Sequence, residues 1–297
     1  MGKKKILVTG GAGFIGYNLV KRLHEEGNSV IVIDDYSTGT QNNQVDGVIY
    51  KELDIEGIEY INGKNIDLCY HLAAQSRVQP SFKDPTECFR VNVLGTQKVM
   101  EWALHNDVEV VYAGSSSKHH DPSDSPYAMF KYLGEEVCKL YKKTYHVGVQ
   151  IARFYNVYGP NESLDIIEGN VIGIWRGLIE KYEGEKSRIL KIVGDGEQRR
   201  DFTHVDDIVD GLIKIAETPI LHEDAWELGT GVNYSINELY KMFKEKYPQV
   251  KSEYIPDQKG NYRETLNKNT DAKDLLGWNA TDKLKDYIKG LHKTKDY

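Results

Sequence analysis

The chain has 297 residues, of which 40% are apolar and 28% charged, and its formal net charge is −7. This length and composition are ordinary for a globular protein with one large or two modest domains. The negative balance gives no bulk electrostatic support for binding a nucleic-acid backbone. The apolar run that follows the three N-terminal lysines is too short for a secretory leader or a membrane span. We therefore expect a cytoplasmic protein that acts on small molecules, with neither nucleic acid nor a membrane among its partners.

The cysteines and the histidine at position 71 do not suggest a metal site. Cys69, Cys88 and Cys138 are odd in number and lack the spacing of metal ligands. Free or buried thiols in a reducing compartment fit this pattern best. His71 lies in a predicted strand without a metal-type partner spaced near it, so we expect a core histidine and no metal.

A glycine-rich turn follows the first predicted strand. Residues 5–9 read as a short buried strand, and Leu19, Val20 and Leu23 repeat at helical spacing. Strand, glycine turn and helix form the context of a dinucleotide-binding fingerprint. Glycines let backbone N–H groups approach a pyrophosphate, and the helix N-terminus supplies partial positive charge. The glycines concerned are Gly10, Gly13 and Gly16.

The second predicted strand, residues 29–33, ends in Asp34 and Asp35. This is the separation of about 20 residues expected for an acid that binds a ribose. Asp34 would accept hydrogen bonds from the adenosine ribose hydroxyls and repel a 2′-phosphate, so the sequence favours NAD over NADP. A structural glycine turn with solvated acids is the alternative, and the combined context disfavours it.

Further strands are predicted to alternate with helices through the first half of the chain. This alternation predicts an α/β fold, a Rossmann-type doubly wound parallel sheet with helices on both faces. Ligands of such sheets bind at the C-terminal strand ends, where Gly13, Asp34, Asp54, Ala73 and Ser115 all fall. The remaining predicted strands are residues 48–53, 66–72, 108–113 and 147–153, and the predicted long helices are residues 85–105 and 127–145.

The alternation loosens after Arg153. We expect residues 1–155 to form an NAD-binding domain, to which 201–224 return, and residues 156–200 and 225–297 to form a smaller α/β substrate-binding domain. A cleft between the two would hold the substrate. The elements expected here are helices at 170–181, 205–217 and 236–247, strands at 189–193 and 226–228, and a last helical turn or two near 271–278.

Ser115, Tyr127 and Lys131 form a candidate acid/base site. Tyr127 and Lys131 are four residues apart on a predicted helix, so they share one face, and Ser115 stands at a strand end. An amphipathic helix with Tyr and Lys as mere surface neighbours is the alternative. A phenolate at pH 7 needs a pKa roughly 3 units below the usual 10, about 4 kcal/mol. Lys131 and an oxidised nicotinamide together could supply that difference.

Five motifs appear in an order that resembles one family. The chain resembles the extended short-chain dehydrogenase/reductases, specifically the NAD-dependent sugar-nucleotide epimerases and dehydratases, from Lys5 to about Trp278. The resemblance implies NAD as cofactor, a nucleotide-diphosphate sugar as substrate and Ser115, Tyr127 and Lys131 as catalytic residues. The motifs lie at residues 9–16, 115–117, 127–131, 153–160 and 200–207.

The resemblance also implies binding residues. For Arg200 the physical reason is that a guanidinium offers two parallel donors to a phosphate. The candidate cofactor-binding residues are Gly10, Gly13, Phe14, Ile15, Gly16, Asp34, Asp35, Asp54, Ile55, Leu72, Ala73, Ala74, Asn92, Tyr127, Lys131 and Tyr155. The candidate substrate-binding residues are Ser76, Ser116, Asn156, Asn170, Val171, Arg200 and Arg263.

The residues after Ser115 bear on the reaction. Dehydratases of the family usually carry Asp-Glu there, whereas this chain has Ser116 and Ser117. We therefore expect a nucleotide-sugar 4-epimerase, of the UDP-glucose or UDP-N-acetylglucosamine type. The alternatives are another NAD-dependent nucleotide-sugar modifier (a 4,6-dehydratase, a reductase or a non-4-epimerase) and a catalytically lapsed NAD-binding regulatory protein. The long helices 85–105 and 127–145 fit the pair that builds the family's homodimer.

Two stretches depart from the family pattern. Only twelve positions separate Ser115 from Tyr127, so a lobe that commonly walls one side of the pocket is missing. His119 and His120 in this short loop either contact substrate, bind a metal with Asp121, or belong to a solvated loop, which we favour. Near the C-terminus, residues 258–261 stand where the family often has Arg-Pro-Gly-Asp, so Lys259 or Arg263 would have to replace the arginine.

Overall fold

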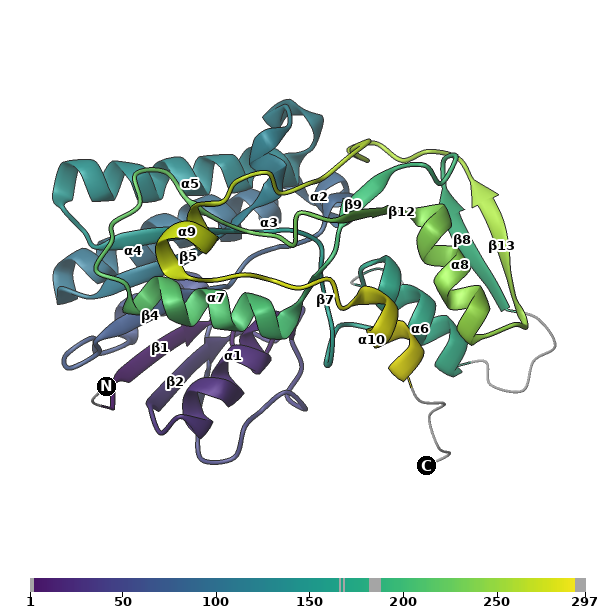
Figure 1. Cartoon of the computed structure of the whole chain (residues 1–297). Coiled ribbons are helices and arrows are strands. Elements are labelled where there is room, and N and C mark those ends of the chain that lie inside the picture. Colours follow the sequence, from purple (N-terminus) through teal and green to yellow (C-terminus); the bar gives the residue numbers. More distant parts are fainter. Residues whose placement is uncertain (1–2, 166, 168, 182–187, 292–297) are drawn as a thin grey trace.

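A seven-stranded parallel sheet forms the larger part of the molecule (Figure 1). The computed structural model describes residues 3–165, 167, 169–181 and 188–291, and parts of both expected domains, residues 1–2, 166, 168, 182–187 and 292–297, lie outside this range. The strand order is β11-β6-β5-β4-β1-β2-β3, which confirms the predicted Rossmann-type sheet. The strands are β1 Lys5–Thr9, β2 Ser29–Asp34, β3 Ile49–Glu52, β4 Leu68–His71, β5 Glu109–Ser115, β6 Val149–Phe154 and β11 Trp226–Leu228.

Helices cover both faces of this sheet. Successive strand residues point to opposite faces, so Ile6 and Val8 pack with α1 (Phe14–Glu25) and α7 (Val205–Glu217). Leu7 instead packs on the other side with α4 (Thr96–Asn106) and α5 (Pro126–Tyr145). The two apolar layers hold the C-terminal strand ends along one edge, where a ligand crevice is expected.

The last strand of the sheet corrects one predicted domain boundary. We expected residues 225–297 in the smaller domain, but β11 pairs parallel with β6, with Trp226 opposite Ala152. Helix α9 (Asp271–Leu276) also packs on the large domain, against β11 and α7. Trp278 lies in the apolar cluster formed with α1 and α7. A strand of three residues carries too little periodicity to be assigned to a sheet from sequence.

The smaller domain lies to one side of the sheet (Figure 1). Strands β8 and β13 pair parallel, β9 and β12 pair antiparallel, and three helices pack around one apolar cluster. Strands β7 and β10 pair where the chain passes between the two parts. The sequence analysis did not predict β7, β9, β10, β12, β13 or α10. The bounds are β7 Val157–Tyr158, α6 Val171–Lys181, β8 Arg188–Val193, β9 Arg199–Asp201, β10 Thr203–His204, β12 Asn233–Ser235, α8 Ile236–Lys246, β13 Val250–Ile255 and α10 Leu284–Gly290.

The predicted helix 85–105 is wrong as a single element. Asp84 caps a short helix, α3 (Pro85–Phe89), by accepting a hydrogen bond from the Glu87 backbone N–H. Residues Arg90–Gly95 then form a π-helical stretch before α4 begins. A further helix, α2 (Val78–Lys83), precedes Asp84 and was not predicted. Helix α2 lies at the edge of the sheet where the C-terminal strand ends meet and a ligand is expected.

The predictions for the three cysteines and for His71 are confirmed. The three cysteines are free and buried, and His71 is a buried core residue whose ring nitrogens meet Thr9 and Thr96 hydroxyls at 2.8 and 3.1 Å. Burial lowers the pKa of His71 to about 3.

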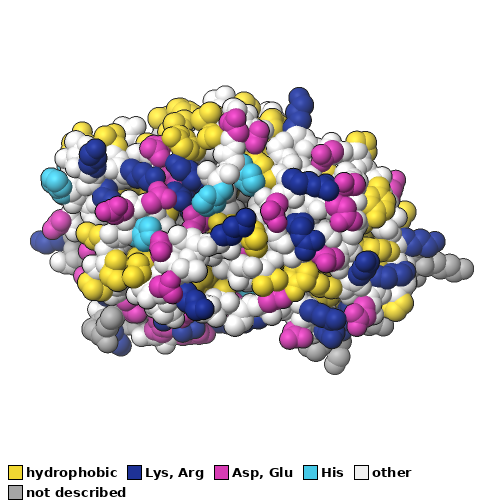
Figure 2. Space-filling view, turned by 45° about the horizontal axis from the view of Figure 1, so that its top comes forward, with side chains coloured by type: hydrophobic (Ala, Val, Ile, Leu, Met, Phe, Trp, Pro, Cys, Tyr) yellow, Lys and Arg dark blue, Asp and Glu magenta, His cyan; other side chains and the backbone are white. Residues whose placement is uncertain are grey.

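Within the described residues, no helix is long and apolar enough to cross a bilayer. Figure 2 shows acidic and basic side chains intermixed on the face drawn.

Candidate active site

A cavity of about 990 Å³ lies at the C-terminal strand ends and extends to the smaller domain. It opens beside β1 and β4, where the strand order reverses and α/β sheets bind their ligands. Most candidate cofactor-binding residues line it. These are Gly10, Gly13, Phe14, Ile15, Gly16, Asp34, Asp35, Ile55, Leu72, Ala73, Ala74, Tyr127 and Lys131.

The glycine turn is shaped for close approach. Gly10 has φ +70°, and a Cβ there would stand 2.7 Å from the Ala73 backbone nitrogen. A Cβ on Gly16 would stand 2.1 Å from the Gly10 carbonyl oxygen, so the helix packs on the turn. A Cβ on Gly13 would meet only that oxygen, at 3.4 Å, and α1 has no side-chain N-cap. Open space before uncapped N–H groups fits a pyrophosphate.

Asp34 is held in place by the backbone around it. One carboxylate oxygen accepts from the Ala12 N–H and the other from the Tyr36 N–H, both at 2.9 Å. Burial raises the pKa of Asp34, and these two hydrogen bonds oppose that shift. Because each oxygen keeps a free lone pair and Asp34 lines the cavity, the carboxylate fits the two hydroxyls of a ribose.

Ser115 and Tyr127 form a hydrogen-bonded pair in the cavity wall, with their oxygens 3.2 Å apart. The Ser115 oxygen also accepts from the Ser117 backbone N–H at 3.2 Å and meets the Ser117 hydroxyl at 3.0 Å. If Ser117 donates both hydrogens, the Ser115 hydrogen remains for the Tyr127 oxygen or a substrate. Ser117 is thus a candidate site residue that was not predicted from the sequence.

Lys131 is anchored apart from this pair. Its ammonium donates to the Ala113 carbonyl and lies 4.7 Å from the centre of the Tyr112 ring. Burial lowers the pKa of Lys131 to about 8, although the Glu135 carboxylate acts the other way. Burial also raises the pKa of Tyr127, and the Ser115 hydrogen bond only partly opposes this. The chain alone therefore does not lower the tyrosine pKa, for which the prediction also required an oxidised nicotinamide.

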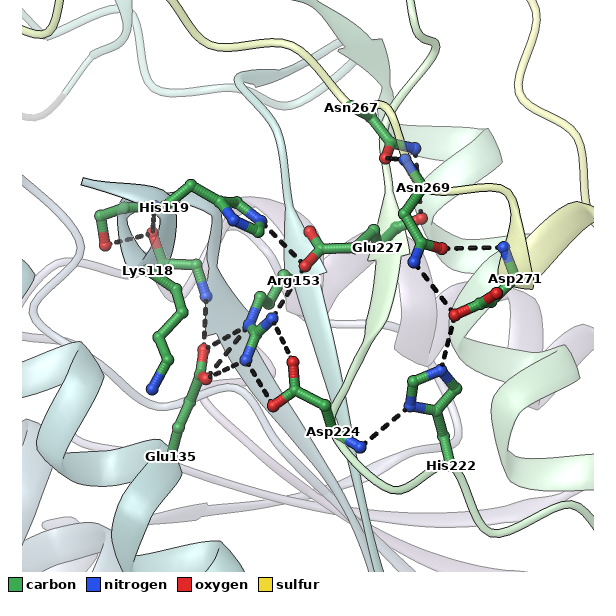
Figure 3. Close-up of polar contacts among 12 residues, drawn as sticks. Lys118, His119, Glu135, Arg153, His222, Asp224, Glu227, Asn267, Asn269 and Asp271 are labelled. Carbon is green, nitrogen blue, oxygen red and sulfur yellow. Dashed lines mark hydrogen bonds and ion pairs between the residues drawn. The ribbon is translucent and has the colours of Figure 1, made fainter.

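Figure 3 shows an ion network around Arg153. Arg153 is 2% exposed and pairs at 2.8 Å with Glu135, with Glu227 and with the half-exposed Asp224. The Ser115 backbone N–H meets Glu135 at 3.5 Å. The network therefore ties α5, β6 and β11 together and reaches the backbone of Ser115 through Glu135.

Six of the seven candidate substrate-binding residues line the cavity. Among them Arg200 is the clearest anion site. Its guanidinium donates to the Arg199 carbonyl and to the Asn261 side-chain oxygen, at 2.8 and 2.6 Å, and forms no ion pair with a carboxylate in the described part of the chain. Burial lowers the pKa of Arg200 to about 10. The six are Ser76, Ser116, Asn156, Asn170, Val171 and Arg200.

Four expected binding residues do not line the cavity. The Asp54 carboxylate pairs with Arg90 at 2.8 Å. Asn92 bonds the Gln75 backbone at 2.8 and 2.9 Å and so supports the cavity wall from behind. The Tyr155 hydroxyl donates to Glu227 at 2.9 Å. The fourth, Arg263, is mostly exposed and pairs with Asp195 at 2.8 Å, so it does not stand in for the missing arginine.

The two histidines of the short loop are engaged by the protein itself. His119 meets a Glu227 oxygen at 2.9 Å. The His120 ring stacks on Tyr262, with ring centres 3.8 Å apart. No group of three or more His, Cys, Asp or Glu side chains arranged to hold a metal occurs among the residues placed in the structure.

Comparison with known proteins identifies the class. Residues 6–229 match the NAD dependent epimerase/dehydratase family. The chain belongs to this family, and NAD is the family's cofactor.

The relatives carry more than one activity. The chain is 34% identical to a putative UDP-glucose 4-epimerase from Methanocaldococcus jannaschii, covering 96% of each chain. It is 30% identical to a UDP-glucose 4-epimerase from Mycolicibacterium smegmatis, covering 99% of this chain and 98% of that one. It is also 29% identical to UDP-glucuronic acid decarboxylase 4 of Arabidopsis thaliana, covering 92% of this chain and 64% of that one.

The similar solved structures also differ in activity. UDP-glucose 4-epimerase from Thermotoga maritima, solved with UDP-glucose, gives a TM-score of 0.87 at 29% identity, covering 96% of each chain. UDP-glucuronic acid 4-epimerase from Bacillus cereus, with UDP-glucuronic acid and NAD, gives 0.84 at 27%, again covering 96% of each. A dTDP-glucose 4,6-dehydratase from Streptomyces venezuelae gives 0.83 at 25%, covering 96% and 94%.

Proposed function

We propose that this protein is an NAD-dependent nucleotide-sugar 4-epimerase that acts on a UDP-hexose such as UDP-glucose. The observation that carries the proposal is the hydrogen-bonded pair of Ser115 and Tyr127, supported by Ser117 where dehydratases usually have a carboxylate. The 4-epimerases among the relatives at full length agree with this choice.

Each catalytic side chain has one task in this reaction. NAD, held by the glycine turn and Asp34, would supply the acceptor and the donor of the hydride that leaves the sugar C4 and returns to its opposite face. Tyr127 removes the proton from the 4-hydroxyl as the carbonyl forms and gives it back on reduction. Ser115 donates to the same oxygen and positions it. Lys131, held at the Ala113 carbonyl, contributes the positive charge of its ammonium near the site.

Two other functions remain as alternatives. Decarboxylase and dehydratase relatives show that the scaffold supports other chemistry at the sugar. Elimination of water needs an acid and a base beyond the tyrosine, and Ser116 and Ser117 offer neither near neutral pH. A regulatory NAD-binding protein without turnover would not need the Ser117, Ser115 and Tyr127 hydroxyls in contact, so their arrangement favours an enzyme.

The test is an NMR assay of the purified protein with UDP-glucose, and with UDP-N-acetylglucosamine in parallel. We expect conversion into the corresponding C4 epimer with no net formation of NADH. Release of water or carbon dioxide from a nucleotide sugar would support the neighbouring activities. Bound NAD without any turnover over a panel of UDP-, GDP-, ADP- and CDP-sugars would contradict the proposal.

Replacing Arg200 with Met should weaken binding of UDP by about 10- to 100-fold, because a charge-assisted bidentate contact with the diphosphate is lost. The NAD content should not change, since Arg200 lies on the substrate side. Calorimetric titration with UDP measures the effect. Arg263→Met is the matched control, because that arginine is exposed and outside the cavity. Equal UDP affinity in the two variants would remove Arg200 from the site.

We further propose a cytoplasmic homodimer that forms through α4 and α5. The apolar side chains of Leu104, Leu140 and Tyr145 on these helices are 37%, 52% and 49% exposed, and a dimer would cover such surface. Light scattering at micromolar concentration should give twice the mass of one chain. A strict monomer would contradict this part of the proposal.

A further inference from the structure

The short stretch between Ser115 and Tyr127 leaves part of the cavity wall to another element. It holds only two 3-10 turns, Ser116–His119 and Pro122–Asp124. After Ser117, no residue of this stretch lines the cavity until Tyr127. Residues 257–263, which follow β13 in the smaller domain and are called here the crossing segment, supply lining residues instead. These are Gln258, Gly260, Asn261 and Tyr262.

The crossing segment is docked against the large domain. The Gln79 side chain in α2 donates to the Lys259 carbonyl at 2.8 Å. Gly260 has φ +72°, and a Cβ there would stand 2.7 Å from a methyl of Val78 and 3.3 Å from the Ser125 Cβ. No larger residue fits this contact without displacement. The segment therefore rests on α2 and on the start of α5, close to the catalytic tyrosine.

Tyr262 is braced by the short loop. Its ring lies nearly parallel to that of His120, with an interplanar angle of 6° and ring centres 3.8 Å apart. Burial lowers the pKa of His120, so the stack joins two neutral rings at neutral pH. Tyr262 lines the cavity and His120 does not, so the histidine supports the tyrosine from outside.

The Tyr262 hydroxyl is a buried polar group without a satisfied contact. It makes no hydrogen bond of acceptable geometry with a described residue, Ser125 being near enough only to lower its pKa. Burial and the Asp124 carboxylate together raise the pKa of Tyr262 to about 12, so the phenol stays protonated as a donor. An unsatisfied buried hydroxyl is unfavourable, and a hydrogen bond to a ligand oxygen would offset that cost.

Tyr262 shares its cavity with the two groups proposed to hold the substrate. Tyr127 and Arg200 line the same cavity as Tyr262. A substrate whose diphosphate meets Arg200 and whose C4 oxygen meets Tyr127 must span the space between them with its hexose. Because Tyr262 lines this cavity, its phenol is a candidate to meet the hexose.

Building on the proposed function, we propose that Tyr262 determines sugar specificity by donating a hydrogen bond from its phenol to a hydroxyl of the substrate hexose. His120 is a positioning residue that acts through the stacked ring. Tyr262, supported by His120, forms the part of the cavity wall that the short loop between Ser115 and Tyr127 does not provide.

The test compares Tyr262→Phe with the unaltered protein. We expect kcat/KM for UDP-glucose to fall about 5- to 10-fold, because one hydrogen bond to the sugar is lost. The Kd for UDP, which has no sugar, should stay within about twofold. Tyr254→Phe is the matched control, since Tyr254 is 57% exposed and outside the cavity, and it should behave like the unaltered protein.

Two variants of the histidine test the support. His120→Ala should lower kcat/KM in the same direction, whereas His120→Phe keeps a ring to stack on and should restore most of it. Equal losses in UDP affinity and kcat/KM for Tyr262→Phe would indicate a structural role and overturn the proposal, as would unchanged kcat/KM. If the unaltered protein neither binds nor converts UDP-glucose, the proposed function fails too. If the unaltered protein converts UDP-glucose normally and Tyr262→Phe has the same kcat/KM, only the role of Tyr262 is overturned.

Discussion

Replacing Tyr127 with Phe is expected to lower kcat for epimerisation by about 10²- to 10⁴-fold, the usual contribution of a positioned acid/base group. The variant keeps the aromatic ring and loses only the oxygen that bonds Ser115 at 3.2 Å. NAD content should be unchanged, because the glycine turn and Asp34 are untouched. The measurement is steady-state turnover of UDP-glucose, together with the NAD released on denaturation.

Tyr132→Phe is the matched control on the same helix. Tyr132 lies under the Lys118 ammonium, 3.8 Å from its ring centre, and does not line the cavity. The substitution retains that ring, so turnover should stay near that of the unaltered protein. Turnover retained in Tyr127→Phe would remove the tyrosine from the mechanism, and loss of NAD from that variant would mean that the effect is structural.

Replacing Arg153 with Met should have the largest effect on stability. Glu135 and Glu227 are 1% and 3% exposed, and both lose their main cationic partner. Breaking a buried ion pair from one side typically costs about 3–5 kcal/mol. Burial alone would raise the pKa of Glu227, and the hydrogen bonds from His119 and Arg153 hold it below its usual value. The free energy of unfolding in urea at pH 8 measures the loss.

The pH dependence of this loss identifies its cause. Without Arg153, burial should raise the pKa of Glu227 in the folded state. A group with a raised folded pKa favours folding below its unfolded pKa and loses that contribution as pH rises. The deficit should therefore shrink at pH 5, and Glu135→Gln in the same chain should recover part of it. Arg22→Met, which removes an exposed pair with Glu26, should cost at most about 1 kcal/mol. A deficit independent of pH would point to lost packing instead.

Local patterns predicted the part of the site that lies on the sheet. The glycine turn follows β1, and Asp34 and Ser115 are the last residues of β2 and β5. Parallel strands bring their C-terminal ends to one edge. The structure places all three residues in one cavity. Tyr127 and Lys131 were predicted by their spacing on one helix, and the structure puts both at that edge.

Local sequence patterns did not predict the contacts between side chains that lie far apart in the sequence. Asp54 follows a strand just as Asp34 does, yet its carboxylate is turned toward Arg90, 36 residues away. Arg263 was expected to replace a missing arginine, and an aspartate 68 residues away holds it outside the cavity. The stack of His120 on Tyr262 joins the two stretches that departed from the family pattern. These outcomes depend on which side chains meet after folding.

In the proposed reaction, oxidation and reduction both occur at the sugar C4. The most direct test uses UDP-glucose carrying deuterium at C4, followed by NMR of the epimer formed. We expect the deuterium to remain on C4 of UDP-galactose and none to enter C4 from D₂O when unlabelled substrate is used. Loss of the label from C4, or its appearance there from solvent, would overturn the proposed reaction.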